Sequence, residues 1–454
     1  MKSFDLIVIG AGSGLTIAVE AANRGLKTAI IEEGSLGGTC LNRGCIPSKM
    51  VIHSADVAEE IRRANLFGLK ASLTGIDFRK VTTRASHTVD EDSKSIELSL
   101  RQGKNPFLFK SRAKFIAPYT LQVGTEKIVG KKIVIAAGAR PTIPPIPGLD
   151  KVPYLTSTEA LRQTRLPKSM IIIGGGYIGA EMGHFYAALG CKVTVIQRGS
   201  LLVPREDNDV AELFTKLWKQ RYGVVCDCDI LRVEKKGKNI IVHTKHGGKE
   251  KKFVAEKLLI ATGVKPNSDT LDLSKTGIKT NEKGFIAVNT YMETSFKNIW
   301  ALGDIAGVYL FKHSANLEAE YVLQNLFGKK KAIDYYPMPH AIFTSPQIAG
   351  VGMTEQEARE KNKNYVVGKY EYQHTGMGAA LEEKDGFVKF IVDRKSKEIL
   401  GCHIIGPDAS TLIHEVVVAM KAGRRRALDI LRETVHVHPA LSEVVQRAAR
   451  KVPV

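Results

Sequence analysis

The stretch DLIVIGAGSGLTIAVEAANRGLKTAIIE, residues 5–32, decides the fold. It contains an apolar strand pattern, a glycine-rich turn, an alanine-rich helical pattern, a glycine and a second apolar strand. Residues 169–197, SMIIIGGGYIGAEMGHFYAALGCKVTVIQ, repeat the same order. Each copy is half of a doubly wound nucleotide-binding fold, in which a helix connects two parallel strands. The sequence therefore predicts two dinucleotide-binding units in one α/β chain.

Proline-rich stretches indicate where these units end. Five prolines fall between residues 141 and 153, a run that neither a helix nor a central strand tolerates. Residues 336–454 have no glycine-rich phosphate loop, and they mix the strand-like FVKFIV (387–392) with the helix-like STLIHEVVVAMKAG (410–423). This mixture is typical of a separate α+β domain. We expect four segments, with bounds 1–145, 146–267, 268–335 and 336–454.

Composition excludes several classes of protein. The 454 residues are 44% hydrophobic and 25% charged, as in an ordinary globular protein, and the six cysteines are too few for a disulfide-rich scaffold. No apolar run approaches the roughly 20 residues that span a bilayer, and no signal-peptide pattern follows Met1, so we expect a cytoplasmic protein without a membrane partner. The net charge of +19 is large, but the basic runs at 329–331 and 424–426 are short and have no interleaved aromatics. We interpret them as solvated surface and expect no nucleic-acid partner.

The first glycine turn has the features of a pyrophosphate site. Gly10, Gly12 and Gly14 follow a strand and open a helix, where backbone N–H groups can approach phosphate closely. Leu15 stands where the usual fingerprint has its third glycine. Glu32 ends the second strand about 20 residues later, where an acid can bind a ribose hydroxyl pair. The context predicts nucleotide binding.

The segment GGTCLNRGCIPSK, residues 37–49, carries the strongest chemical signal. Cys40 and Cys45 are separated by four residues, and Ile46-Pro47 indicates a helix that begins at or just after Cys45. A thiolate at a helix N-terminus is stabilised and reactive, and Arg43 adds positive charge. The alternative is half of a zinc site, which needs a second ligand pair; Cys226-x-Cys228 is a poor match. We expect a redox pair and no metal.

With this segment the chain resembles the pyridine nucleotide–disulfide oxidoreductases, closest to their dihydrolipoamide dehydrogenase and mycothione reductase-like members. The resemblance covers essentially the whole chain. It recurs in AAGARP (136–141), GGGYIGAE (174–181), ATGVKPN (261–267), IWALGDIAG (299–307) and HVHPALSE (436–443). It implies two Rossmann-like domains and a C-terminal dimerisation domain in a homodimer. Residues 1–145 and 268–335 would then form the FAD domain, 146–267 the NAD(P) domain and 336–454 the dimerisation domain.

The resemblance also assigns the cofactor residues. Asp304 would hold the ribityl chain of FAD, and Lys49 and Glu181 would pair beside the flavin. The predicted FAD residues are Gly10, Gly12, Ser13, Gly14, Glu32, Gly38, Thr39, Lys49, Ala137, Gly138 and Asp304. The predicted NAD(P) residues are Gly174, Gly176, Tyr177, Ile178, Gly179, Glu181, Gln197, Arg198, Arg205 and Gly263.

By the same resemblance, Cys45 is the thiolate against the flavin and Cys40 is the interchange thiol that attacks the substrate. His438, supplied by the other subunit, is the active-site base, and Glu443 orients its imidazole. A histidine that titrates near neutrality suits a thiol that must lose and regain a proton. His436 is interpreted as structural. The family passes electrons between nicotinamide, flavin, the cysteine pair and the substrate, in a direction that depends on relative potentials.

The second glycine turn points to NADPH rather than NADH. It has all three fingerprint glycines, but Gln197 stands where the first copy has Glu32, and Arg198 and Arg205 follow. Loss of the acid removes repulsion against a 2′-phosphate, and an arginine can bind that phosphate with two hydrogen bonds. Two exposed arginines without that role are the alternative.

The substrate is less constrained than the chemistry. The chain ends AARKVPV without the C-terminal cysteine pair of mercuric reductases, and AVEAAN (18–23) lacks the basic residues of glutathione reductases. Arg43, where the family usually has valine, favours an anionic substrate or reshapes the pocket. We expect an NAD(P)H-dependent reductase of a small disulfide, with a role in cell redox homeostasis. The alternatives are a dihydrolipoamide dehydrogenase that acts on a lipoyl group and a flavoprotein relay subunit without thiol turnover.

Overall fold

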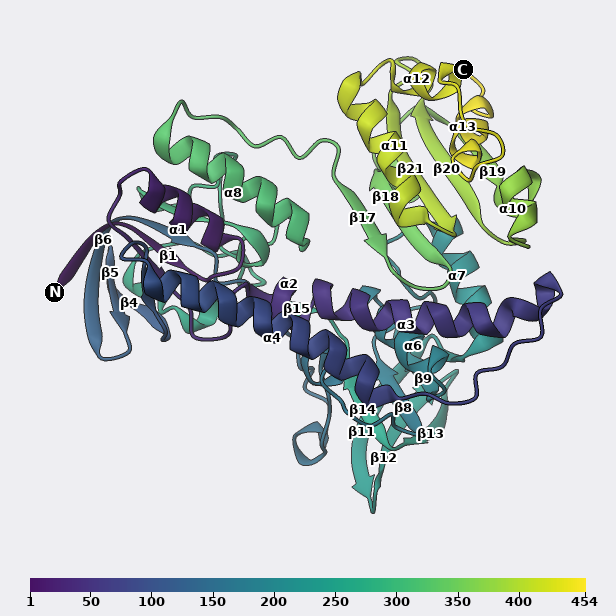
Figure 1. The fold of residues 1–454 in the computed structure, drawn as a ribbon, viewed down its shortest axis with the longest axis horizontal. Coiled ribbons are helices and arrows are strands. Elements are labelled where there is room, and N and C mark those ends of the chain that lie inside the picture. The colour runs from purple at the N-terminus through teal and green to yellow at the C-terminus, as the bar shows by residue number, and fades with distance from the viewer. The chain divides into compact units, whose positions relative to one another are not determined.

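The computed structural model describes all 454 residues (Figure 1). The chain divides into two compact units. Unit 1 comprises Met1–Met50, Lys80–Thr142 and Gly263–Tyr335, and unit 2 comprises Val51–Arg79, Ile143–Thr262 and Tyr336–Val454. The first glycine turn lies in unit 1, whereas the second glycine turn and the C-terminal segment lie in unit 2. The bounds of the four predicted domains stay a prediction.

Unit 1 is built on a seven-stranded sheet whose order is β3-β2-β1-β6-β5-β4, with β16 paired to β6. The strands are β1 (Lys2–Ile9), β2 (Thr28–Ile31), β3 (Phe107–Phe109), β4 (Ala113–Ala117), β5 (Thr120–Val123), β6 (Glu126–Ile135) and β16 (Ile299–Ala301). β1 pairs in parallel with both β2 and β6. Five of its eight residues are buried, including Leu6–Ile9 at its C-terminal end, as expected for a strand that is covered on both faces.

Helices and loops cover the two faces of this sheet. One face packs on α1 (Gly14–Asn23) and α8 (Lys312–Phe327), and the other packs on residues 271–305. The cysteine segment forms α2 (Gly38–Arg43) and the start of α3 (Cys45–Arg63), followed by η1 (Ala64–Phe67) and α4 (Phe78–Gln102). β7 (Ala139–Pro141) pairs with β15 (Val264–Pro266), and β7 ends where the proline-rich stretch 141–153 begins. The short 3-10 helices of this unit are η3 (Asn267–Thr270), η4 (Leu273–Lys275) and η5 (Gly303–Ile305).

Unit 2 contains the second repeat as a four-stranded parallel sheet, in the order β10-β9-β8-β14. Its strands are β8 (Ser169–Ile173), β9 (Lys192–Ile196), β10 (Gly223–Val225) and β14 (Lys257–Ile260), and its helices are α5 (Ser157–Ala160), α6 (Tyr177–Ala188) and α7 (Asn208–Arg221). η2 (Leu149–Lys151) precedes them. The order strand, glycine turn, helix, parallel strand is the same in both units, so the predicted repeat and fold class are confirmed.

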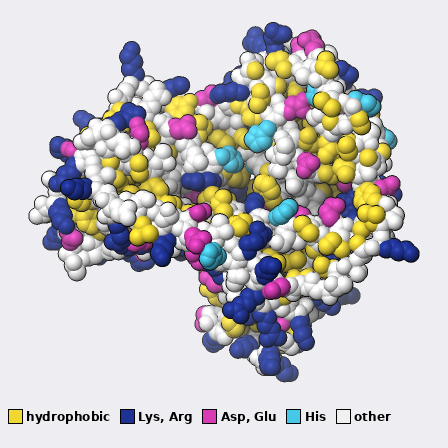
Figure 2. Space-filling view, in the orientation of Figure 1, with side chains coloured by type: hydrophobic (Ala, Val, Ile, Leu, Met, Phe, Trp, Pro, Cys, Tyr) yellow, Lys and Arg dark blue, Asp and Glu magenta, His cyan; other side chains and the backbone are white.

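An antiparallel sheet of β11 (Cys228–Lys236), β12 (Asn239–His246) and β13 (Lys249–Ala255) extends from this repeat. Figure 2 shows Lys and Arg side chains gathered over it. The exposed lysines on these strands and their turns are Lys235, Lys236, Lys238, Lys245, Lys249, Lys251 and Lys252. Residues 228–255 contain eight Lys and Arg against three Asp and Glu, so this sheet carries a net charge of +5 of the chain's +19.

The C-terminal segment forms a five-stranded antiparallel sheet in the order β17-β18-β21-β20-β19. The strands are β17 (Pro339–Ile342), β18 (Gln347–Gly352), β19 (Tyr365–Glu371), β20 (Phe387–Asp393) and β21 (Ile399–Gly406). Its helices are α9 (Glu355–Glu360), η6 (Tyr372–His374), α10 (Gly376–Ala380), α11 (Ala409–Ala422), α12 (Ala427–Glu433) and α13 (Glu443–Arg450). β20 and α11 coincide with the predicted strand and helix patterns. None of the helices is long and apolar enough to cross a membrane.

Candidate active site

At the first glycine turn, three backbone segments of unit 1 pack closely against one another: residues 10–12, Gly38 and Ala136. A Cβ on Gly10, whose φ is +101°, would lie 2.2 Å from the carbonyl oxygen of Ala136, and a Cβ on Gly38 would lie 2.7 Å from the Cα of Gly12. Only glycine fits at such approaches. Because Gly38 begins α2, the helix that carries Cys40 is packed directly on the turn. The turn thus presents bare backbone, which suits the pyrophosphate of FAD.

Glu32 and Ser13 complete this turn. The Ala11 N–H donates to Glu32 Oε2 at 2.9 Å, and the Gly34 N–H donates to Glu32 Oε1 at 2.8 Å. The carboxylate therefore holds the turn to the end of β2 and keeps lone pairs that can accept from a ribose. Ser13 donates to Asn316 of α8 at 3.0 Å.

The remaining predicted FAD residues also lie in unit 1. Asn267 binds the loop after β6 through both its backbone N–H, to the Gly138 carbonyl at 3.0 Å, and its side chain, to the Ala137 carbonyl at 2.7 Å. Asp304 lies in η5, and burial raises the pKa of its carboxyl. Thr39 is exposed on α2. The residues present fit the cofactor, although their roles stay predictions.

Cys40 and Cys45 are adjacent free thiols, joined by a hydrogen bond. α3 begins at Cys45, as the Ile46-Pro47 sequence predicted. The hydrogen bond with Cys45 and burial raise the pKa of the Cys40 thiol, whereas the ammonium of Lys312 acts against that shift. The other four cysteines are buried.

Lys312 is a site residue that sequence analysis missed. It is the first residue of α8, is half-buried, and its Nζ donates to Ser13 Oγ at 2.8 Å. Burial lowers the pKa of its ammonium, while the charges of Cys40, Cys45 and Asp304 oppose that effect. In the sequence it stands in FKHSANLEAE, residues 311–320, which contains neither a glycine turn nor a cysteine.

The second glycine turn, in unit 2, has the same construction. A Cβ on Gly174, whose φ is +106°, would lie 2.4 Å from the Ala261 carbonyl, and one on Gly179 would lie 1.9 Å from the Gly174 carbonyl. Gly176 has open space around it, at the N-terminus of α6. The turn therefore fits a dinucleotide pyrophosphate.

Gln197 takes the place of Glu32 in this second turn. The Gly175 N–H donates to Gln197 Oε1 at 2.9 Å, the same distance as the bond from Ala11 to Glu32. Arg198 and Arg205 are exposed on the segment that follows β9. Gly263 falls at the first residue of a unit 1 segment, and Ile178 is exposed on the first turn of α6.

His438 and Glu443 are brought together in unit 2. Nδ1 of the imidazole lies 3.1 Å from each carboxylate oxygen of Glu443, and Arg447 donates to Oε1 at 3.2 Å. The hydrogen bond from His438 holds the pKa of the Glu443 carboxyl below its usual value. The His438 side chain is 71% exposed, so its second nitrogen is accessible. His436 is bound instead to Glu415.

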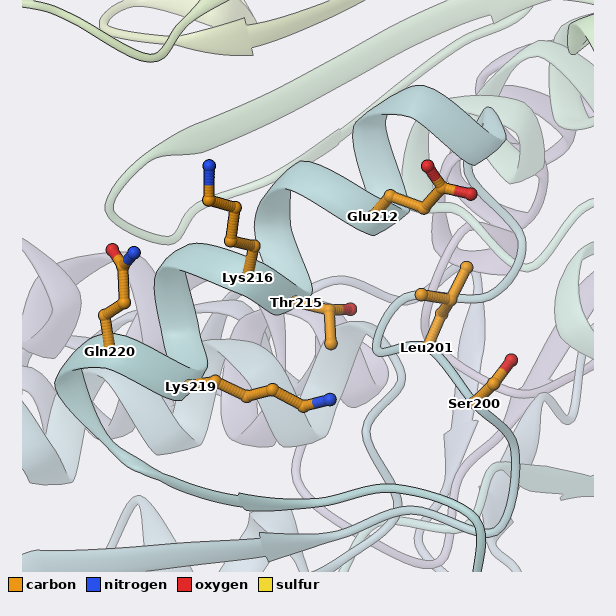
Figure 3. Close-up of a pocket in the computed structure, with 7 residues that line it drawn as sticks. All are labelled: Ser200, Leu201, Glu212, Thr215, Lys216, Lys219 and Gln220. Atoms are coloured by element: carbon orange, nitrogen blue, oxygen red, sulfur yellow. The ribbon is translucent and has the colours of Figure 1, made fainter.

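Lys49 and Glu181 belong to different units, and their pairing stays a prediction. Lys49 Nζ lies 3.4 Å from Ser48 Oγ on α3. Glu181 Oε1 accepts from the Phe343 N–H at 3.1 Å. A surface hollow beside α7, lined by Ser200, Leu201, Glu212, Thr215, Lys216, Lys219 and Gln220, contains none of the predicted site residues (Figure 3).

Two dinucleotide turns, a dithiol packed on one of them and a carboxylate-bound histidine define an oxidoreductase that exchanges electrons with thiols or disulfides. The chain belongs to the pyridine nucleotide-disulphide oxidoreductase family, which it matches over residues 4–320, and it matches that family's dimerisation domain over residues 338–449. It is thus a FAD-dependent enzyme that acts on sulfur groups and uses a nicotinamide nucleotide, and the dimerisation domain supports a homodimer.

Similar proteins span the whole chain. Mycothione reductase of Mycobacterium tuberculosis is 35% identical, with 99% of each chain covered. Dihydrolipoyl dehydrogenase of Thermus scotoductus is also 35% identical, with 99% of this chain and 97% of the relative covered. Among solved structures, the Cu(II) complex of the HOCl-induced flavoprotein disulfide reductase RclA of Escherichia coli has a TM-score of 0.89 and 30% identity, with 99% of each chain covered.

Proposed function

We propose that this enzyme reduces a low-molecular-weight disulfide at the expense of NADPH, through Cys40 and Cys45. The observation that carries the choice of nucleotide is the Gln197 amide, which accepts the turn N–H of Gly175 at 2.9 Å without the negative charge of Glu32. A neutral amide at this position does not repel the 2′-phosphate of NADPH as a carboxylate would. The exposed Arg198 and Arg205 supply positive charge nearby.

Cys40 and Cys45 perform the thiol–disulfide exchange with the substrate. The net reaction consumes one NADPH, one proton and one disulfide, and yields NADP⁺ and two thiols. Bound FAD supplies the two-electron connection between the nicotinamide and the cysteine pair. The Cys40 thiolate attacks one substrate sulfur and breaks the substrate S–S bond, and His438 protonates the leaving thiolate. Cys45 then attacks Cys40, which releases the second thiol and re-forms the Cys40–Cys45 disulfide.

Two side groups support these steps. Glu443 orients the His438 imidazole through Nδ1, so that Nε2 faces the substrate. The Lys312 ammonium favours the thiolate forms of the cysteines, because an opposite charge nearby stabilises an anion. We further propose that Lys49 and Glu181 pair beside the flavin, and that His438 serves the cysteines of the other subunit. A cytoplasmic location and a role in redox homeostasis stay predictions.

A steady-state screen tests this assignment. Purified enzyme is assayed with NADPH and NADH, each against lipoamide, glutathione disulfide, coenzyme A disulfide and a mycothiol-type disulfide. NADPH with a small disulfide is the expected best pair. NADH with lipoamide as the best pair would instead identify a dihydrolipoamide dehydrogenase.

The variant Gln197→Glu tests whether Gln197 sets the preference for NADPH over NADH. It keeps the acceptor for the Gly175 N–H but restores the charge, so KM for NADPH should rise at least tenfold while KM for NADH falls or stays constant. Glu33→Gln, at an exposed acid near the first turn, serves as the control because that residue pairs only with Arg112 at the surface. Equal effects of Gln197→Glu on the two nucleotides would contradict the proposal.

A further inference from the structure

One face of α6 is bound to the C-terminal sheet of the same unit. Tyr177 and Glu181 lie one helical turn apart and so share a face. The Tyr177 ring stacks on His340 of β17, with centroids 6.1 Å apart and planes 20° apart, and Glu181 accepts the Phe343 N–H. The helix that starts at the second glycine turn is therefore held by residues 340–343.

The hydroxyl of Tyr177 is hydrogen-bonded to the buried carboxylate of Glu206. It donates to Glu206 Oε1, and the other carboxylate oxygen accepts from His340 Nε2 at 2.9 Å. Glu206 is 1% exposed. Although burial alone would raise the pKa of its carboxyl, the imidazole of His340 holds that pKa below its usual value, so Glu206 is an anion. Burial and this anion raise the pKa of Tyr177, so its hydroxyl stays a donor.

Hydrogen bonds and burial restrain Glu206 and its neighbour Asp207. The carbonyl of Glu206 accepts from Gln356 Nε2 at 2.8 Å, and the next residue, Asp207, is fully buried against Lys389 Nζ at 2.8 Å. His340 is confined as well, because a Cβ on Gly350 would lie only 2.6 Å from its Cε1. Tyr177 is thus bonded to Glu206, in the segment before α7, and Glu206 is in turn bonded to His340 of β17 and Gln356 of α9.

We propose that Glu206 and His340 are positioning residues for the nicotinamide nucleotide: they hold the Tyr177 ring at the mouth of the second glycine turn, and they set the affinity for the nucleotide without touching it. The inference rests on the proposed function, in which this turn binds the nucleotide. Tyr177 follows Gly176 directly and is the first residue of α6, so its backbone borders the turn where the phosphates would lie. Without the bond to Glu206, the ring would sample other rotamers, and ordering it again would oppose binding.

Three variants test the support. Tyr177→Phe removes only the hydroxyl, Glu206→Ala removes the acceptor, and Glu206→Gln keeps an acceptor of the same shape. The KM for the nicotinamide nucleotide should rise about tenfold in the first two, equivalent to about 1.4 kcal/mol. It should rise less than threefold in Glu206→Gln. The kcat with saturating nucleotide should change less than twofold in Glu206→Ala and Glu206→Gln, a separation that a general loss of packing would not give.

Matched controls exist in the same unit. Tyr186→Phe removes a buried hydroxyl of α6 that donates to the Ala160 carbonyl at 2.6 Å, and Glu234→Gln alters a carboxylate paired with His243 at 2.8 Å. Both should leave the KM for the nucleotide unchanged. Thermal unfolding and FAD content of each variant show whether it folds, and Tyr177→Phe decides the question if Glu206→Ala does not.

The outcomes separate the two proposals. A wild-type enzyme that binds neither NADPH nor NADH overturns the proposed function. A wild-type enzyme that binds the nucleotide, with KM unchanged or lowered in both Tyr177→Phe and Glu206→Ala, overturns the positioning role alone. A fall in kcat as large as the rise in KM would also overturn it.

Discussion

The charge of Lys389 should be among the largest single contributions to the stability of unit 2. This lysine of β20 is 1% exposed, and its Nζ lies 2.8 Å from Asp207 Oδ1, 2.6 Å from Glu355 Oε2 and 3.3 Å from Asp209 Oδ2. Lys389→Met keeps most of the apolar chain but removes the charge. Breaking a buried ion pair costs about 3–5 kcal/mol. Asp207 keeps the backbone N–H donors of Glu355 and Asp209, so we expect the lower end, about 3 kcal/mol.

Urea unfolding measures this cost. Trp218 is fully buried in unit 2, and Trp300 is the only other tryptophan, so a Trp300→Phe background makes fluorescence report on unit 2. In that background Lys389→Met should lower the free energy of unfolding by about 3 kcal/mol. Lys369→Met is the control, because that lysine is 39% exposed and lies 3.4 Å from Asp209. It should cost at most about 1 kcal/mol.

Two further results check the reasoning. Lys389→Met/Asp207→Asn should recover part of the loss, since no uncompensated buried charge remains. The pKa of Asp207 is held below its usual value because His403 and Lys389 outweigh its burial, so its contribution to stability is present above the unfolded pKa and is lost as the pH falls through the folded one. In Lys389→Met, the free energy of unfolding should therefore fall less steeply as the pH decreases. If Lys389→Met cost no more than Lys369→Met, the buried charge cluster would not stabilise the unit.

Three predictions concern the reaction. Cys45→Ser should abolish the long-wavelength absorbance that appears on anaerobic reduction with NADPH, whereas Cys40→Ser should retain such absorbance and lose disulfide turnover; equal turnover by Cys40→Ser and wild type would contradict the roles. Lys312→Met should raise the pKa of the Cys40 thiol and slow its alkylation by iodoacetamide at pH 8 about tenfold, while Lys312→Arg should not; unchanged alkylation would exclude an electrostatic role. Glu443→Gln should lower kcat about 10- to 100-fold with an unchanged FAD spectrum, because the imidazole of His438 loses its charged partner; wild-type kcat would refute this.

The parts of the fold that the sequence predicted are those with a local signature. Apolar runs and glycine turns predicted the two repeats, and the structure has parallel strands and a helix in each. The start of α3 at Cys45 followed from a single Ile-Pro step. The His438–Glu443 pair could also be predicted, because its members are only five positions apart in the sequence.

The parts that escaped prediction depend on long-range packing of single residues. Lys312 reaches Ser13 across 299 positions, and His340 reaches Glu206 across 134. Neither residue belongs to a periodic pattern, and each is an ordinary surface residue until the fold buries it. The sequence shows Gln197 at the position that Glu32 occupies in the first copy, but it gives no reason why glutamine rather than any other residue stands there.

The comparison of the two turns supplies that reason. Each glycine turn leaves one backbone N–H that points at the end of the second strand, and a buried donor without an acceptor is costly. Glu32 and Gln197 both provide a carbonyl-type oxygen at 2.9 Å, so both satisfy the turn. The hydrogen bond therefore constrains the shape of the side chain but not its charge. An amide lacks the negative charge of an acid but preserves the turn, so folding alone does not require an acid at this position, and the proposed preference for NADPH rests on that difference.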